Sequence, residues 1–255
     1  MTAQTAIEWT ETTWNPVTGC DRISPGCDNC YALRLAGRLK AMGQARYAND
    51  GDPRTSGPGF AVTCHPAALA DPYRWRRARM VFVNSMSDLF HAKVPATFVA
   101  EVWRVMANTP QHVYQVLTKR PERMVRTVAK LAGTYGVLPN VWLGTSVEAD
   151  AYTRRIEYLR RTPAAVRFLS LEPLLEALPS LDLTGIGWVI VGGESGPGHR
   201  PIRAEWVTPI RDACVAAEIP FFFKQWGGRT PKAGGRELDG RVWNQFPDHA
   251  QRRHT

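Results

Sequence analysis

The sequence predicts an α/β fold, a partial TIM-like (β/α) barrel of about six to seven parallel strands. Short apolar runs alternate with helical stretches, each apolar run ends in polar residues, and 255 residues suffice for one barrel domain. Alternation repeated this often is typical of a parallel sheet with crossover helices. An open doubly wound sheet has the same alternation of strands and helices. The residues at the strand ends must therefore decide between such a sheet and a barrel.

The expected strands are short runs rich in β-branched and aromatic residues. In chain order they lie in residues 7–20, 80–88, 112–120, 140–148, 166–173, 186–195 and 219–227. Stretches with helical periodicity follow most of these runs. The expected helices cover residues 31–43, begin at Pro95 and at Pro121, cover residues 149–161, and begin near Ala204. Proline is favoured in the first turn of a helix, which supports two of these starts.

Polar residues that end these strands are expected to share one edge, because a (β/α) barrel carries its site at the carboxyl ends of its strands. They are Asn84, Ser85, Asp88, Thr118, Lys119, Arg120, Thr145, Ser146, Glu148, Ser170, Glu172, Gly192, Gly193, Glu194, Ser195, Lys224, Gln225 and Trp226. Polar residues also mark where any strand becomes a loop. That explanation suits Ser, Thr and Gly better than Glu148, Glu172, Glu194 and Lys224, which favour a functional site.

Three of the five cysteines lie close together in the segment TGCDRISPGCDNCYA, residues 18–32. Cys20, Cys27 and Cys30 have the spacing C-x6-C-x2-C in a loop with glycine and proline. In a reducing compartment, clustered cysteines bind metal or do redox chemistry more often than they form disulfides. The spacing therefore predicts a metal centre.

The spacing alone leaves the metal open. Structural zinc usually has four ligands, whereas a cluster with an open iron uses three cysteines. A zinc ion with His65, Cys64 or Asp28 as its fourth ligand would hold the loop together and have only a structural role. The loop follows the first expected strand, so the thiolates would lie at the barrel mouth, which favours a catalytic cluster.

The net charge of +9 favours a polyanionic partner. Candidate phosphate contacts are Arg74, Arg76, Arg77, Lys119, Arg120 and Arg200. Arginine beside aromatic rings such as Tyr73 and Trp75 can hold a phosphate and stack a base. A basic, solvated surface would give the same net charge, but we favour a nucleic acid or nucleotide as substrate.

Residues 1–226 are expected to form one barrel domain, with the cysteine loop at 18–32, and residues 227–255 a polar C-terminal extension. No apolar run is long enough to span a bilayer, and the first residues lack a signal-peptide pattern. We therefore expect a cytoplasmic protein that makes no membrane contact. A protein partner that supplies part of the site is left open.

Several segments resemble known proteins. A three-cysteine loop after the first strand of a partial barrel resembles the radical S-adenosylmethionine (SAM) superfamily. The segments WNPVTGC, CDNCYA, SDLFH, LTKRPERM, WLGTSVE, LSLEPLL, VIVGGESG and FFKQWG more closely resemble a phage-associated family of three-cysteine-motif proteins of unknown function. The likeness extends from about Trp9 to Trp226.

This resemblance implies a radical-SAM-like fold with a 4Fe-4S cluster on Cys20, Cys27 and Cys30, and with SAM at the open iron. The resemblance and the strand ends together suggest further roles. Ser85, Ser146 and Glu148 would contact the ribose and amino group of SAM. Gly192 and Gly193 would hold SAM or a phosphate through backbone N–H groups. Glu172, Glu194 and Lys224 would orient groups or move protons in an enzyme that modifies or repairs nucleic acid.

Two other functions fit the same residues. One is a non-catalytic nucleic-acid-binding protein with a structural zinc or iron-sulfur site. The other is a barrel hydrolase or transferase that uses the strand-end carboxylates and keeps the cysteines for structure. We favour the radical SAM-type enzyme.

Overall fold

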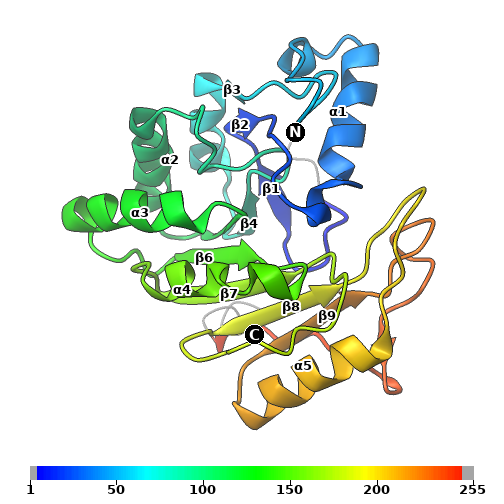
Figure 1. Cartoon of the computed structure of the whole chain (residues 1–255). Helices are drawn as coiled ribbons and strands as arrows, with labels where there is room; N and C mark the ends of the chain where they lie inside the picture. The colour runs from blue at the N-terminus through cyan, green and yellow to red at the C-terminus, as the bar shows by residue number, and fades with distance from the viewer. Residues whose placement is uncertain (1–4, 249–255) are drawn as a thin grey trace.

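The computed structural model describes residues 5–248. Its main feature is a sheet of seven strands in the order β1-β4-β5-β6-β7-β8-β9, in which every neighbouring pair is parallel. The strands are β1 (Thr12–Trp14), β4 (Met80–Val83), β5 (Val113–Thr118), β6 (Val141–Ser146), β7 (Val166–Leu171), β8 (Trp188–Gly192) and β9 (Phe221–Gln225). Within the described residues β1 and β9 do not pair with each other, so the sheet is a curled half-barrel (Figure 1). The predicted partial barrel of parallel strands is confirmed.

The α-helices of the described chain are α1 (Tyr31–Ala41), α2 (Ala96–Asn108), α3 (Pro121–Tyr135), α4 (Arg155–Arg160) and α5 (Ala204–Ala216). The expected starts at residues 31, 121 and 204 agree with the structure. The helix expected over residues 149–161 is instead a 3-10 turn, Asp150–Tyr152, followed by the short α4. None of the helices within residues 5–248 is both long and apolar enough to cross a membrane.

α1 packs with Phe60 and Met86 in a separate small core, and α2, α3, α4 and α5 cover one face of the sheet (Figure 1). Alternate strand residues point towards them, as the pleat of a strand requires. Val189 and Val191 of β8, for example, belong to the same core as Val207 and Ile210 of α5. The residues between them on the strands point to the concave face.

The concave face is filled with aromatic rings near the amino ends of the strands. We call this cluster the aromatic plug. It consists of Trp9, Phe82, Trp142, Phe168, Trp188, Phe222 and Phe246. Trp188 lies at its centre, with ring centroids 5.8 Å from Trp142, 5.6 Å from Phe168 and 5.2 Å from Phe246. The amino-terminal half of the barrel is therefore a packed core, and only the carboxyl-terminal half can hold a site.

Two small antiparallel sheets complete the described chain. β2 (Val17–Thr18) pairs with β3 (Thr63–Cys64), and β10 (Glu237–Leu238) pairs with β11 (Arg241–Val242). The segment after Trp226, expected to be a polar extension, buries Leu238 and Trp243. The Phe223 N–H donates to the Trp243 carbonyl at 3.0 Å, so the described part of this segment packs against β9.

Candidate active site

The concave face changes from aromatic to polar towards the carboxyl ends of the strands. Side chains that point to the same face of a strand lie two residues apart. Along each strand the side chains on the concave face are therefore aromatic or apolar at the amino end and polar at the carboxyl end. We call these residues the polar floor. They are Lys119, Ser146, Ser170, Glu172, Gly192 and Lys224. The structure therefore brings strand-end residues from β5 to β9 to one surface, as the sequence predicts.

The cysteine loop, residues 18–32, lies over this floor. The Gly19 N–H donates to the Met86 carbonyl after β4 at 2.9 Å. Gly26 packs against Glu148 after β6, because a Cβ added to Gly26 would lie 3.1 Å from the carboxyl carbon. Asn29 reaches Glu194 after β8. The loop thus contacts the carboxyl ends of three strands.

The three thiols of the loop are unbridged and half-buried. Burial raises the pKa of Cys20 to about 12, although Arg120 opposes this, and burial also raises the pKa of Cys30. An ionised Cys27 would raise both pKa values further. Within residues 5–248, no three His, Cys, Asp or Glu side chains are arranged to hold a metal ion.

Cys30 lies at the N-terminus of α1, where backbone N–H groups lack helical partners. The N–H groups of Ala32 and Leu33 hydrogen-bond its sulfur and favour the thiolate. A helix N-terminus also favours negative charge. The N-terminus of α1 therefore offsets part of the effect of burial, which still raises the pKa of Cys30 above its ordinary value.

A guanidinium group is fixed against the first cysteine. Arg120 Nη1 donates to Cys20 Sγ at 3.4 Å and to Asp88 Oδ2 at 2.9 Å, while Nη2 donates to the Asp21 carbonyl at 2.8 Å. Asp88 is 5% exposed and also accepts the Thr118 hydroxyl at 2.8 Å. The ends of β4 and β5 thus hold a positive charge beside Cys20. An N–H···S bond to a thiolate ligand is one way in which proteins stabilise a bound cluster.

Glu148 is fully buried between two cations. Its Oε2 accepts from Arg155 Nη1 at 2.9 Å, and Lys119 Nζ lies 3.7 Å away. Burial alone would raise the pKa of Glu148, but Lys119 and Arg155 hold it below its ordinary value. The ionised Glu148 carboxylate therefore lies under the cysteine loop, where it contacts Gly26.

Glu172 and Lys224 form an ion pair on the polar floor. Their side chains are 20% and 17% exposed, so the pair can be reached from the mouth. Tyr31 follows the last cysteine, is 51% exposed, and donates its hydroxyl to the Ser85 carbonyl at 2.6 Å. Glu172 and Lys224 are thus in direct contact on this surface.

The two predicted serine contacts differ in their surroundings. The Ser85 hydroxyl hydrogen-bonds the Asn15 amide at 3.2 Å beside the cysteine loop. Ser146 is 4% exposed, and its carbonyl accepts from Arg155 Nη1 at 2.9 Å. Ser85 is the more accessible of the two, and the ligand role of both stays a prediction.

Glu194 has both carboxylate oxygens occupied. Oε2 accepts from the Asn29 amide at 2.8 Å and from the Arg200 backbone N–H at 2.9 Å, and Oε1 accepts from Arg200 Nη2 at 2.5 Å. This arrangement suits a positioning role better than proton transfer. Arg200, expected to contact phosphate, is committed to the same carboxylate.

Residues 4–247 match the family described as "Protein of unknown function (DUF5131)". The chain belongs to this family. No curated protein matches it.

Solved structures of spore photoproduct lyase are similar to part of this DUF5131 chain. A cysteine-to-serine mutant matches with a TM-score of 0.48 and 11% identity, covering 76% of this chain and 58% of that chain. The complex with dinucleoside spore photoproduct matches with a TM-score of 0.46 and 10% identity over 76% of this chain and 58% of that one. A double mutant with bound AdoMet and dinucleoside spore photoproduct has a TM-score of 0.47 and 10% identity over 75% and 58%. The DUF5131 chain spans 58% of the length of these proteins.

The basic residues predicted to contact phosphate do not form one surface. Lys119, Arg120 and Arg200 lie at the mouth of the DUF5131 barrel, where each is close to a carboxylate. The other three, Arg74, Arg76 and Arg77, are exposed and precede β4. They lie near the amino end of that strand, opposite the cysteine loop.

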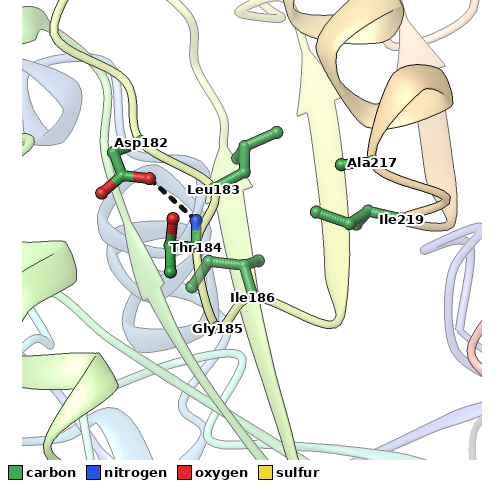
Figure 2. A pocket seen from close by; sticks show the side chains of 7 residues that line it. All are labelled: Asp182, Leu183, Thr184, Gly185, Ile186, Ala217 and Ile219. Atoms are coloured by element: carbon green, nitrogen blue, oxygen red, sulfur yellow. Dashed lines mark hydrogen bonds between the residues drawn. The ribbon is translucent and has the colours of Figure 1, made fainter.

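Figure 2 shows a pocket that also lies away from the cysteines. It is lined by residues 182–186 before β8 and by Ala217 and Ile219 before β9. The Thr184 N–H donates to Asp182 Oδ1 at 2.9 Å, and most of the remaining lining is apolar. The pocket is at the amino ends of the strands, so it is separate from the candidate active site.

Several residues that build the site were not predicted from the sequence to belong to it. Arg155, Arg34 and Asn29 make contacts that only the folded chain creates. His91, close after β4, is buried: its Nδ1 accepts the Lys93 N–H at 3.1 Å, so Nε2 carries the proton that is shared with Asp21 at 3.0 Å. A buried histidine with both nitrogens engaged supports the loop rather than a metal.

His65 makes stability depend on pH. Burial and nearby Arg46 lower its pKa to about 4. The unfolded chain binds a proton near pH 6.5 and the folded protein does not, so stability falls as pH drops from about 6.5 to 4. For a partly exposed ring we expect about 1–2 kcal/mol. Urea unfolding of the native protein and His65→Gln at pH 7.5 and pH 4.5 measures this, and the variant should lose less stability between the two. An equal loss in both proteins would contradict the assignment.

Proposed function

We propose that this protein is a radical-SAM-like iron-sulfur enzyme that acts on a nucleic acid or nucleotide. The observation that carries the proposal is the position of three unbridged, half-buried thiols in a loop over the polar floor of a half-barrel. The sequence resemblance noted above supports the same chemistry. Cys20, Cys27 and Cys30 would hold a 4Fe-4S cluster.

The donor set fits such a cluster. Each thiolate of a 4Fe-4S cluster binds a different iron, so the three sulfur atoms need not converge on one point as they do around zinc. The positive charge of Arg120 beside Cys20 and the N-terminus of α1 beside Cys30 both stabilise thiolates. Three cysteines leave one iron without a protein ligand.

A cluster of this kind, with SAM at its open iron, supplies one-electron cleavage of SAM and abstraction of hydrogen from a substrate. The chain would contribute the surroundings. Ser85 is available for polar groups of SAM, the buried Glu148 would support the cysteine loop beneath the cluster, and Glu172 with Lys224 can hold or move a proton beside the substrate. The aromatic plug closes the barrel below these groups and excludes water from that side.

The net charge of +9 supports a polyanionic substrate. Mouth cations are largely neutralised, since Lys224 pairs with Glu172 and Arg120 with Asp88. Attraction would therefore come from the wider surface, including the exposed Arg76 and Arg77. Binding to a labelled single-stranded oligonucleotide should weaken steeply with salt.

Anaerobic purification followed by iron, sulfide and zinc analysis tests the cluster. We expect about four irons per chain, and an electron paramagnetic resonance signal after dithionite reduction that changes on addition of SAM. The reduced protein should also convert SAM to 5'-deoxyadenosine. Cys27→Ala should lose iron and this activity.

Cys64→Ala is the matched control, because Cys64 lies on β3 outside the motif and should leave the iron content unchanged. One zinc and no iron in the native protein would instead favour a structural metal site. SAM cleavage that survives Cys27→Ala would refute the catalytic role of the motif.

A further inference from the structure

The glycine-rich loop after β8 is tied to the cysteine loop. We call residues 193–200 the latch loop. The cysteine loop follows β1, which is one edge of the sheet, and the latch loop follows β8, next to the other edge strand, β9. Since β1 and β9 do not pair within the described chain, contacts between these loops join the two sides of the open barrel.

Glu194 is the centre of the connection. It is 6% exposed and accepts from the Asn29 amide of the cysteine loop at 2.8 Å. Three groups of Arg200 also donate to this carboxylate, namely the backbone N–H, Nε and Nη2. Burial would raise the pKa of Glu194, but Arg200 and Asn29 keep it below its ordinary value. The carboxylate is therefore charged and fully used inside the protein.

Arg200 extends the connection to the backbone between the cysteines. Its Nη2 donates to the Pro25 carbonyl at 2.9 Å, and Nη1 lies 3.5 Å from the Asp28 carboxylate. The Asn29 amide also donates to the Gly198 carbonyl at 3.0 Å. Residues on both sides of Cys27 are thus held by the latch loop.

Arg34 makes the reverse connection, from α1 to the latch loop. Its Nη2 donates to the Ser195 carbonyl at 2.9 Å and to the Asn29 carbonyl at 3.1 Å, and Nη1 donates to the Pro197 carbonyl at 3.3 Å. A Cβ on Gly196 would lie 2.5 Å from the Arg34 guanidinium. Glycine suits this position because its φ of 109° lies in the region that side chains rarely adopt, and the absent Cβ leaves room for Arg34 to cross the loop.

Gly193, the first residue of the latch loop, is also packed closely against other parts of the protein. A Cβ on Gly193 would lie 2.1 Å from the Trp226 carbonyl oxygen, and the Gly193 N–H already donates to Gln225 at 2.8 Å. That N–H is therefore not free for a phosphate. Close contact between backbones explains this glycine without a ligand.

We propose that the latch loop positions Cys27 and Cys30, with Glu194 as the residue that joins it to Asn29. This inference deepens the proposed function, because it gives the glycine-rich motif a structural task in building the cluster site. The charged groups of the latch loop, Glu194 and Arg200, then hold the cysteine thiols in position before any metal binds. Asn29 occupies the position just before the last cysteine, so a single amide controls the orientation of that turn.

A double-mutant cycle between the two loops tests the latch. Asn29→Ala, Glu194→Ala and the double variant are compared with the native metal-free protein by amide hydrogen exchange. We expect each single variant to speed exchange of residues 27–34 at least tenfold. The double variant should be little faster than the faster single one, because both remove the same connection.

Asp28→Ala is the matched control, because the Asp28 side chain is 59% exposed and its ion pair with Arg200 is long, at 3.5 Å, so it contributes little. It should change exchange less than threefold. Unchanged exchange in Asn29→Ala, or effects that multiply in the double variant, would overturn the proposal. If Glu194→Ala fails to fold, Asn29→Ala with Glu194→Gln completes the comparison.

Iron retention gives a second measurement that depends on the proposed function. Loaded Asn29→Ala should release iron to a chelator several times faster than the native protein. A native protein that binds no iron would refute the proposed cluster, while the exchange experiment would still decide the latch. The two inferences can therefore fail separately.

Discussion

Gly19→Ala is expected to destabilise the protein by more than about 4 kcal/mol, which lowers Tm by roughly 10 °C for a chain of this size. Gly19 has φ of 85°, and an added Cβ would lie 2.0 Å from the Ala61 carbonyl oxygen. The left-handed backbone costs about 1–3 kcal/mol for alanine, and the clash forces the strand pair β2–β3 apart. Calorimetry measures the loss.

Two other glycines separate these causes. Gly43→Ala keeps a positive φ, 72°, but meets no atom within 4 Å, so it should cost about 1 kcal/mol. Gly133→Ala lies inside α3 with open space around it and should stabilise by about 0.5–1 kcal/mol. If Gly19→Ala costs no more than Gly43→Ala, the close contact with Ala61 is not rigid.

Glu148→Gln is expected to cost about 3–5 kcal/mol, because it leaves the 5%-exposed Arg155 side chain without its buried counter-charge. Lys119, only 16% exposed, loses the same partner. Urea unfolding of the metal-free protein measures the change, so the result does not depend on a cluster. Adding Arg155→Met to the variant should recover part of the loss.

Glu157→Gln is the control for this prediction. Glu157 pairs with Arg160 on the surface and its side chain is 66% exposed, so its loss should cost less than about 0.5 kcal/mol. Equal costs for Glu148→Gln and Glu157→Gln would mean that the buried pair around Glu148 is hydrated in solution.

The strands could be located because each is a short run rich in β-branched and aromatic residues that ends in polar ones. Which face each residue takes could not be read from the sequence, since Trp188 and Ile190 on the concave face and Val189 and Val191 on the helix-facing side are all apolar. The exact ends were harder to predict. The strand expected over residues 80–88 ends at Val83, because Asn84 takes φ of 63°, which no strand can continue.

The strand-end carboxylates could be found in the sequence, but their tasks could not. Glu172 and Glu194 both follow apolar runs, yet one faces the polar floor beside Lys224 and the other is buried against Arg200. The difference depends on residues far away in the chain, such as Asn29, which nothing local connects with Glu194. Sequence spacing identifies a barrel edge, and only the fold shows which of its carboxylates pairs with a cation on the polar floor and which is buried against the cysteine loop.

The aromatic plug has a consequence for the biosynthesis of the protein. Trp188 contacts Trp9, with centroids 6.3 Å apart, and also Phe246, so its neighbours come from opposite ends of the described chain. Contacts between residues so far apart in sequence slow folding, since long loops must close before the contact forms. Until the segment that carries Phe246 has been synthesised, the concave face lacks one of its rings. The strands made before it therefore leave part of the apolar surface around Trp188 uncovered during that interval.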